Sequence, residues 1–127
     1  MPKFPKEERL YLEKQIDELF QKGKSINAFP VRMIWQIQPG NVPARILFSV
    51  PKRKFKHAVD RNRIKRLMRE AYRLNKSSFV EMLQKEEKQV VVAFLFNGHE
   101  LPKYKGIADK IILLLQRLCN ELQSHSS

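Results

Sequence analysis

The sequence predicts an α+β fold: a single small domain, an αβββαβα-like sandwich of helices on a mixed sheet. Three patterns lead to this prediction: apolar residues at helical spacing near both ends, alternation with period two in 29–38, and an almost wholly apolar run in 89–96. A length of 127 residues suffices for one core. We therefore assign residues 1–127 to one domain and expect disorder at 1–5 and 123–127.

The first half of the chain is predicted to form a helix and then strands. Residues 6–20 carry apolar side chains at helical spacing, and Gly23 follows where a C-terminal cap would lie. Residues 29–38 alternate apolar and polar side chains, and a Pro-Gly-Asn turn follows them. Residues 44–50 form the next strand. Together these two strands are expected to form an antiparallel hairpin.

The second half contains further helices and one buried strand. After Pro51 comes a basic loop, 52–56, which leads into a basic helix. A short helix is expected over 77–87, after a break in the pattern. Residues 89–96 are mostly β-branched or aromatic, as in a strand buried on both faces. Residues 104–122 place Ile and Leu on one helical face, which predicts a final helix.

The basic helix, within residues 55–73, has one apolar face and one cationic face. At about 100° per residue, the two groups of side chains fall on opposite sides of the helix. The apolar face consists of Ile64, Leu67, Met68 and Ala71. The cationic face consists of Arg61, Asn62, Lys65, Arg66, Arg69 and Arg73.

Positive charge is concentrated around this helix. Residues 45–76 contain twelve Lys or Arg and two acids, so they carry +10 of the net charge of +12. Arg61, Lys65 and Arg69 lie four residues apart and repel one another, at about 0.2–0.5 kcal/mol per pair. An anion that bridges them would remove this cost. Focused charge beside a folded core therefore predicts a nucleic-acid partner.

No motif for protein-borne catalysis or metal binding is present in the sequence. The three histidines are far apart, and there is no CxxC pair and no glycine-rich phosphate loop. The single cysteine, Cys119, lies in a helical pattern and is expected to be a small core residue. The longest apolar run, 111–115, is far shorter than a membrane span, and no signal peptide is evident in 1–8. We expect a cytoplasmic protein without a membrane partner.

Residues 58–72, AVDRNRIKRLMREAY, strongly resemble the RNR signature of the bacterial ribonuclease P protein subunit. The strand and basic turn at 48–53 also resemble that family, as do the helix end at 19–23 and Ser25. The order of the late apolar strand and final helix fits as well, so the resemblance covers nearly the whole chain. An Arg-Asn-Arg triplet alone would be weak, but a block of this length in this context is highly specific.

The resemblance implies a fold and a role. It implies a left-handed βαβ crossover, against the usual hand. It also implies a non-catalytic protein subunit of an endoribonuclease, itself monomeric, whose partners are ribonuclease P RNA and precursor tRNA. The RNA would remove the 5′ leader with Mg²⁺ held mainly by the RNA and the substrate. The protein would bind the leader and favour productive metal binding, with no catalytic residue of its own.

The resemblance also assigns roles to particular residues. Phosphate contacts are expected from Arg61, Asn62, Arg63, Lys65, Arg66 and Arg69, extended by Lys52, Arg53 and Lys54. Phe20 matches an aromatic residue of the leader-binding cleft, where a ring can stack on a nucleotide, although it also fits as an ordinary core residue. Trp35 is a candidate for the same cleft from the strand that also carries Arg32 and Ile34.

Two departures from the family pattern affect these assignments. Ile16 stands where the family often has an aromatic residue, one turn before Phe20, so apolar packing replaces stacking there. Lys56 and His57 stand where Gly-Asn is common, which removes a favourable N-cap residue.

Three other classes of protein share part of this pattern. A ribosomal protein would share the charge and the helix but would not need the signature. A DNA-binding protein would use similar arginines, but no helix-turn-helix pair or dimer zipper is evident. A stand-alone nuclease would need carboxylates placed for metal binding, whereas the acids here are spread among lysines.

Overall fold

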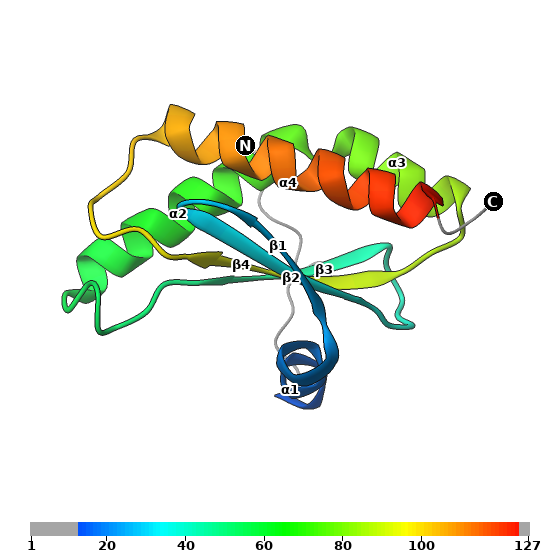
Figure 1. Ribbon diagram of the computed structural model, residues 1–127, viewed down its shortest axis with the longest axis horizontal. Coiled ribbons are helices and arrows are strands. Elements are labelled where there is room, and N and C mark those ends of the chain that lie inside the picture. Colours follow the sequence, from blue (N-terminus) through cyan, green and yellow to red (C-terminus); the bar gives the residue numbers. More distant parts are fainter. Residues whose placement is uncertain (1–12, 125–127) are drawn as a thin grey trace.

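The computed structural model describes residues 13–124, which form four helices and four strands within that range (Figure 1). The first elements are α1 (Glu13–Lys22), β1 (Lys24–Ala28), β2 (Val31–Ile37) and β3 (Ala44–Ser49). The remaining elements are α2 (Ala58–Asn75), α3 (Ser77–Lys85), β4 (Val90–Phe96) and α4 (Tyr104–Ser124). The predicted α+β class is confirmed. The part of the first predicted helix before Glu13 lies outside the described residues, as do the expected disordered ends, except that α4 includes 123 and 124.

The four strands form one mixed sheet in the order β1-β2-β4-β3. β4 pairs antiparallel with β2, from Val31↔Phe96 to Ile37↔Val90, and parallel with β3. The predicted hairpin of β2 with β3 is therefore wrong, because β4 lies between them. The physical reason is the composition of β4, which is apolar on both faces and is buried along nearly its whole length. Only a central position in the sheet, covered on both sides, buries both sets of its side chains.

The parallel pairing of β3 with β4 requires a connection that crosses from one end of the sheet to the other. α2 and α3 supply that crossover. α2, α3 and α4 lie together on one face of the sheet (Figure 1). Their position leaves one side of α2 turned away from the core.

The main core fills the space between these helices and the sheet. Tyr72 of α2 and Phe94 of β4 are both fully buried, and both rings contact Phe48 of β3. The Phe48 and Phe94 rings stack with their centroids 5.7 Å apart. α4 adds a buried apolar stripe along its length, including Ile111 and Leu118. α2 is thus fixed against β3 and β4 by aromatic and aliphatic contacts.

α1 covers the opposite face of the sheet (Figure 1). Leu19 is fully buried there against Ile34 of β2 and Val91 and Ala93 of β4. Gly23 ends the helix, as predicted, and its N–H donates to the carbonyl of Leu19 at 2.8 Å. A Cβ atom at residue 23 would lie 2.4 Å from that carbonyl oxygen and 2.7 Å from Ile34 Cγ2. Glycine is therefore required where α1 turns into β1.

Candidate nucleic-acid interface

α2 packs by one face, as predicted, although the buried stripe is shifted. Ile64, Met68, Ala71 and Tyr72 are fully buried, whereas Leu67 is only half-buried. Tyr72 extends the buried stripe at one edge, and Leu67 packs partly buried at the other edge. These four buried positions follow the i, i+4, i+7, i+8 spacing of a core-facing stripe. The shift is small, so the cationic residues still lie on the outward side.

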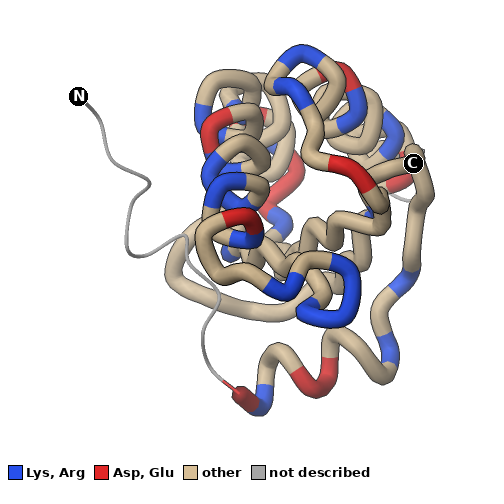
Figure 2. Tube along the Cα trace, turned by 90° about the vertical axis from the view of Figure 1, so that its left-hand side faces the viewer, with Lys and Arg blue, Asp and Glu red and all other residues tan. Residues whose placement is uncertain are grey.

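The exposed outer side of α2 carries the central residues of the signature. Asn62, Arg63 and Arg66 are exposed and Lys65 is half-buried. Within residues 13–124, no carboxylate forms an ion pair with Arg63, Lys65 or Arg66. Figure 2, which looks onto the left-hand end of Figure 1, shows Lys and Arg gathered along a helix and the loop beside it. Cations without acidic partners are suited to bind a polyanion.

The loop before α2 continues this charge. Lys52 and Arg53 are exposed, while Lys54 is partly buried and its Nζ donates to the carbonyl of Asn97 at 2.6 Å. Lys54 therefore anchors the loop to the segment after β4. We define the basic surface by the residues of this loop and of the outer side of α2. It consists of Lys52, Arg53, Lys54, Asn62, Arg63, Lys65 and Arg66.

Arg61 has a role in the structure that sequence reasoning missed. Its Nη1 donates to the carbonyls of Phe55 and Lys56, at 2.7 and 2.9 Å. His57 is the N-cap of α2 and makes no side-chain hydrogen bond to the helix, in line with the departure noted in the sequence. Arg61 thus holds the chain at the entry to the helix. Arg61 Nη1 already donates to these carbonyls, so the expected phosphate contact would have to use the other N–H groups of the guanidinium.

The guanidinium groups of Arg69 and Arg73 also have partners within the protein, so the cationic face is not uniform. The Arg69 guanidinium lies over the Phe48 ring, 5.7 Å from its centroid, and is half-buried. Arg73 forms a two-point pair with Glu70, with Nε 3.1 Å from Oε2. The hydrogen bond from Arg73 lowers the pKa of the Glu70 carboxyl, and the same bond raises the pKa of Arg73. Glu70 thereby neutralises the C-terminal end of the face, and the uncompensated charge lies toward the start of α2.

The face of the sheet next to α1 is the second part of the candidate interface. Arg32 and Ile34 lie on this face, because side chains alternate along β2 and Ile34 contacts Leu19. Among the described residues, no hydrogen-bond acceptor contacts the buried Nε of Arg32. Arg32 pairs in register with Leu95, which pairs with Ser49, at the end of the sheet where β3 leads into the basic loop. This cation therefore lies on the side of the molecule closest to that loop.

Trp35 does not fit the expectation that it lines a cleft with Phe20. It is 4% exposed and packs in the main core with Val31 and Met33, on the face opposite α1. Lys24 covers the ring, with its Nζ 5.6 Å from the centroid. The register of β2 thus places Arg32 and Ile34, rather than Trp35, next to α1. The ring therefore exposes little surface on which a base could stack.

Phe20 has the exposure that the cleft assignment needs. It lies near the end of α1 and is 46% exposed, in contrast to the fully buried Leu19 beside it. Neither core cluster includes its side chain. This exposure does not fit the alternative of an ordinary core residue. The ring remains accessible on the helix that covers the Arg32 face of the sheet.

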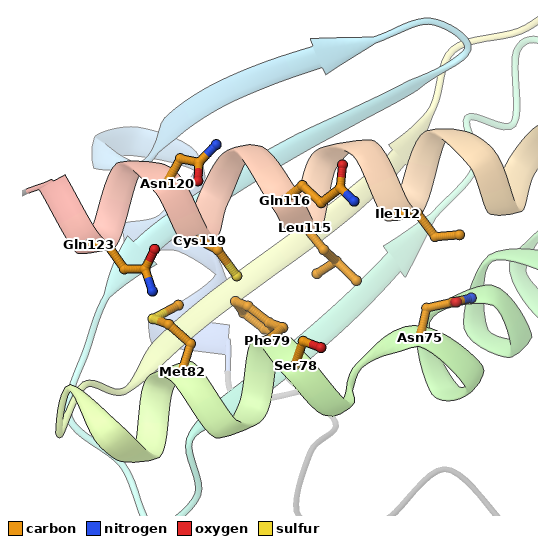
Figure 3. A pocket seen from close by; sticks show the side chains of 10 residues that line it. All are labelled: Asn75, Ser78, Phe79, Met82, Ile112, Leu115, Gln116, Cys119, Asn120 and Gln123. Carbon is orange, nitrogen blue, oxygen red and sulfur yellow. The ribbon is translucent and has the colours of Figure 1, made fainter.

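A groove of about 440 Å³ lies between α3 and α4, away from the signature residues (Figure 3). Phe79, Met82 and Leu115 form an apolar floor, and amide side chains such as Gln116 and Asn120 lie around it. Cys119 also lines the groove and packs, partly buried, against the main core. Burial raises the pKa of its thiol. This makes the thiol less reactive than that of a solvent-exposed cysteine.

The described part of the chain contains neither a candidate cluster of metal ligands nor a candidate membrane-spanning helix. No three His, Cys, Asp or Glu side chains within residues 13–124 come together in a way that would hold a metal ion. No helix in that range is long and apolar enough to cross a membrane.

Comparison with known proteins identifies the family. The family model for ribonuclease P matches residues 4–119. The chain is 36% identical over 121 residues to the ribonuclease P protein component of Porphyromonas gingivalis. The aligned region covers 94% of this chain and 88% of that protein. It is 38% identical over 114 residues to the protein of the same name from Chlorobaculum tepidum, covering 81% and 74% of the two chains.

Two solved structures share the fold. The RNase P protein of Staphylococcus aureus superposes with a TM-score of 0.68 at 21% identity, covering 87% of this chain and 94% of that one. The RNase P protein of Thermotoga maritima gives a TM-score of 0.69 at 23% identity, with coverage of 87% and 96%. The family match and the curated relatives agree with the signature on α2. The chain therefore belongs to the bacterial ribonuclease P protein component family.

Proposed function

We propose that this chain is the protein subunit of a ribonucleoprotein endoribonuclease that removes the 5′ leader of precursor tRNA. The observation that carries the proposal is a set of cations on α2 that form no ion pair within residues 13–124 and lie at the signature positions of a family member: Arg63, Lys65 and Arg66. The basic surface would bind the phosphates of ribonuclease P RNA. Bidentate guanidinium contacts suit this role, because they fix the register of the RNA as well as adding affinity. Precursor tRNA is made in the cytoplasm, which is where such a complex would act.

The face beside α1 would receive the single-stranded leader. Phe20 offers an exposed ring for stacking, and Arg32 offers a cation whose Nε has no acceptor among the described residues. Bases and phosphates of one strand would thus meet different side chains on the same side of the sheet. A leader bound there would increase the affinity for precursor tRNA relative to mature tRNA.

The phosphodiester chemistry is assigned to the RNA. The carboxylates within residues 13–124 form no group able to hold a metal, so no step is assigned to a metal on the protein. Mg²⁺ would be held by phosphates of the RNA and the substrate. The protein would act as a monomeric subunit that neutralises phosphate charge and orients the substrate.

The proposal is tested by cleavage of precursor tRNA at low Mg²⁺ by a bacterial ribonuclease P RNA, with and without the protein. The wild-type chain should stimulate cleavage. The variant Arg66→Ala should stimulate less, because one exposed phosphate contact is lost. Lys85→Ala is the matched control: it removes one exposed cation at the end of α3, outside the basic surface, and should behave as wild type.

Two results would contradict the proposal. The first is an absence of stimulation in spite of tight RNA binding, which would leave a general RNA-binding domain such as a ribosomal protein. The second is cleavage by the protein without RNA, lost when acidic residues are replaced, which would indicate a stand-alone nuclease.

A further inference from the structure

An exposed aromatic side chain lies outside both parts of the interface described so far. Phe29 follows β1 directly and is 68% exposed, the highest exposure of any described aromatic residue. Leu101 and Tyr104 are also exposed, at 46% and 36%. Exposing a phenyl ring to water to this extent is unfavourable in free energy, and a ligand that covers the ring would remove this penalty.

Phe29 forms one wall of a pocket of about 370 Å³. Pro30, Phe96, Leu101 and Pro102 supply most of the remaining surface, which is largely apolar. Gly98 keeps the pocket compact: a Cβ atom there would lie 2.7 Å from Phe96 Cζ and 3.1 Å from Pro30 Cβ. We call this the Phe29 pocket. Its walls come from the β1–β2 turn and from the segment after β4.

Hydrogen bonds connect the Phe29 pocket to the basic surface. The N–H of Asn97 donates to the carbonyl of Pro30 at 2.7 Å. The carbonyl of the same Asn97 accepts the 2.6 Å hydrogen bond from Lys54 Nζ. The rings of Phe55 and Phe96 are in contact, with centroids 5.8 Å apart, which joins the base of the pocket to the basic loop. One residue, Asn97, therefore links an apolar pocket to a loop of phosphate-binding character.

This combination of chemistry defines the ligand. Glu100 is the one acidic residue that lines the pocket among the described residues, whereas Lys52, Arg53 and Lys56 are exposed on the adjoining loop. A ligand that spans both must have an anionic backbone and a flat apolar group. An unpaired nucleotide has both features, and every base can stack on a phenyl ring. An apolar segment of a protein partner could fill the pocket, but it would leave the adjoining cations without anionic partners.

We propose that the Phe29 pocket receives an unpaired base of the RNA whose phosphates lie on the basic surface. The inference rests on the proposed function, since it requires that this surface bind RNA. Stacking on Phe29 would add affinity without displacing counterions, because the phenyl ring carries no charge. The pocket would therefore strengthen binding in a way that salt does not weaken.

The test measures the affinity of a bacterial ribonuclease P RNA for the full-length protein across a series of salt concentrations. Phe29→Ala should weaken binding about 5- to 150-fold, the range for loss of one stacked base, with the slope of log affinity against log salt unchanged. Phe29→Trp, which keeps an aromatic ring at this position, should bind about as tightly as wild type. Ile37→Ala is the matched control, because Ile37 is also exposed, at 53%, but lies at the other end of β2 and pairs with Val90. It should bind as wild type.

A second readout uses the tryptophan that Phe29→Trp introduces. The chain has one tryptophan of its own, Trp35, which is buried and gives a constant background. RNA binding should quench the emission of the new tryptophan and should protect it from acrylamide. Both effects should be absent in the wild-type protein measured in parallel.

The outcomes separate this inference from the proposed function. If Arg66→Ala leaves RNA affinity and salt slope unchanged, the proposed function itself fails, and this inference fails with it. If Arg66→Ala weakens binding while Phe29→Ala binds as tightly as wild type, the base-binding pocket alone is refuted. A loss in Phe29→Ala matched by Ile37→Ala, or accompanied by a lower unfolding midpoint, would also overturn it.

Discussion

At the scale of single residues, the N-terminus of α2 lacks a side-chain capping hydrogen bond. His57 occupies the N-cap with φ −86° and ψ 129°, the extended geometry of a capping residue, yet its side chain makes no capping bond. A serine or asparagine oxygen in this place accepts a bond from a free N–H of the first turn. The fixed position of the loop, held by Arg61, means that the backbone geometry is already set.

We therefore expect His57→Ser to raise the free energy of unfolding by about 0.5–1 kcal/mol. Urea denaturation of the two proteins would measure the difference. Lys56→Ser serves as the control, because it changes an exposed neighbour one position before the cap and should leave the unfolding midpoint nearly unchanged. A variant no more stable than wild type would mean that the first turn already has other partners.

At the scale of the element, the orientation of α2 decides which residues support the fold and which remain for a ligand. Met68 is fully buried between the helix and the sheet, whereas Leu67, one position before it, is only half-buried. Met68→Ala should lower the free energy of unfolding by about 2–5 kcal/mol. Leu67→Ala should cost clearly less, because part of its surface already contacts water. Chemical denaturation of both variants gives the comparison, and an equal or larger loss for Leu67→Ala would show that the helix is rotated from the orientation described.

The elements themselves could be predicted from the sequence more readily than their pairing. Periodicity is local, so it located α2, α4 and β4. Pairing depends on competition between distant segments, and the short turn after β2 favoured a hairpin that the insertion of β4 prevents. The backbone N–H of Gln38 donates to the carbonyl of Gln89, and the backbone N–H of Val90 donates to the carbonyl of Pro43. The connection between β2 and β3 therefore passes across the start of β4 instead of forming a tight hairpin.

The same limit applies to the candidate site. The alternation along β2 places Trp35 on one face and Arg32 and Ile34 on the other, but it does not show which of these faces α1 covers. Arg61 belongs to a cationic face by periodicity, but its backbone contacts depend on how the loop folds back over the helix. Charge pattern identified the face, and only the three-dimensional arrangement separated Arg61 and Arg73 from Arg63 and Arg66.

At the scale of the whole molecule, the residues proposed to bind RNA lie on both sides of the sheet and at one end of it. α2 and the basic loop present charge, α1 presents Phe20 beside Arg32, and the Phe29 pocket lies next to the loop. The net charge of +12 is almost entirely the charge of one region, so the rest of the surface has little attraction for RNA. Affinity should therefore depend on a few cations rather than on total charge.

The double variant Arg63→Ala/Arg66→Ala should reduce the salt dependence of RNA binding. Both side chains are exposed and have no ion pair within residues 13–124, so their loss should leave the fold intact and remove two phosphate contacts. The slope of log affinity against log salt should fall in magnitude by about 1.4 to 1.8, at roughly 0.7 to 0.9 per contact. The control Lys85→Ala/Lys110→Ala removes the same charge from α3 and α4 and should leave the slope unchanged. If the two double variants change the slope equally, binding follows net charge, and α2 is not the specific surface for RNA.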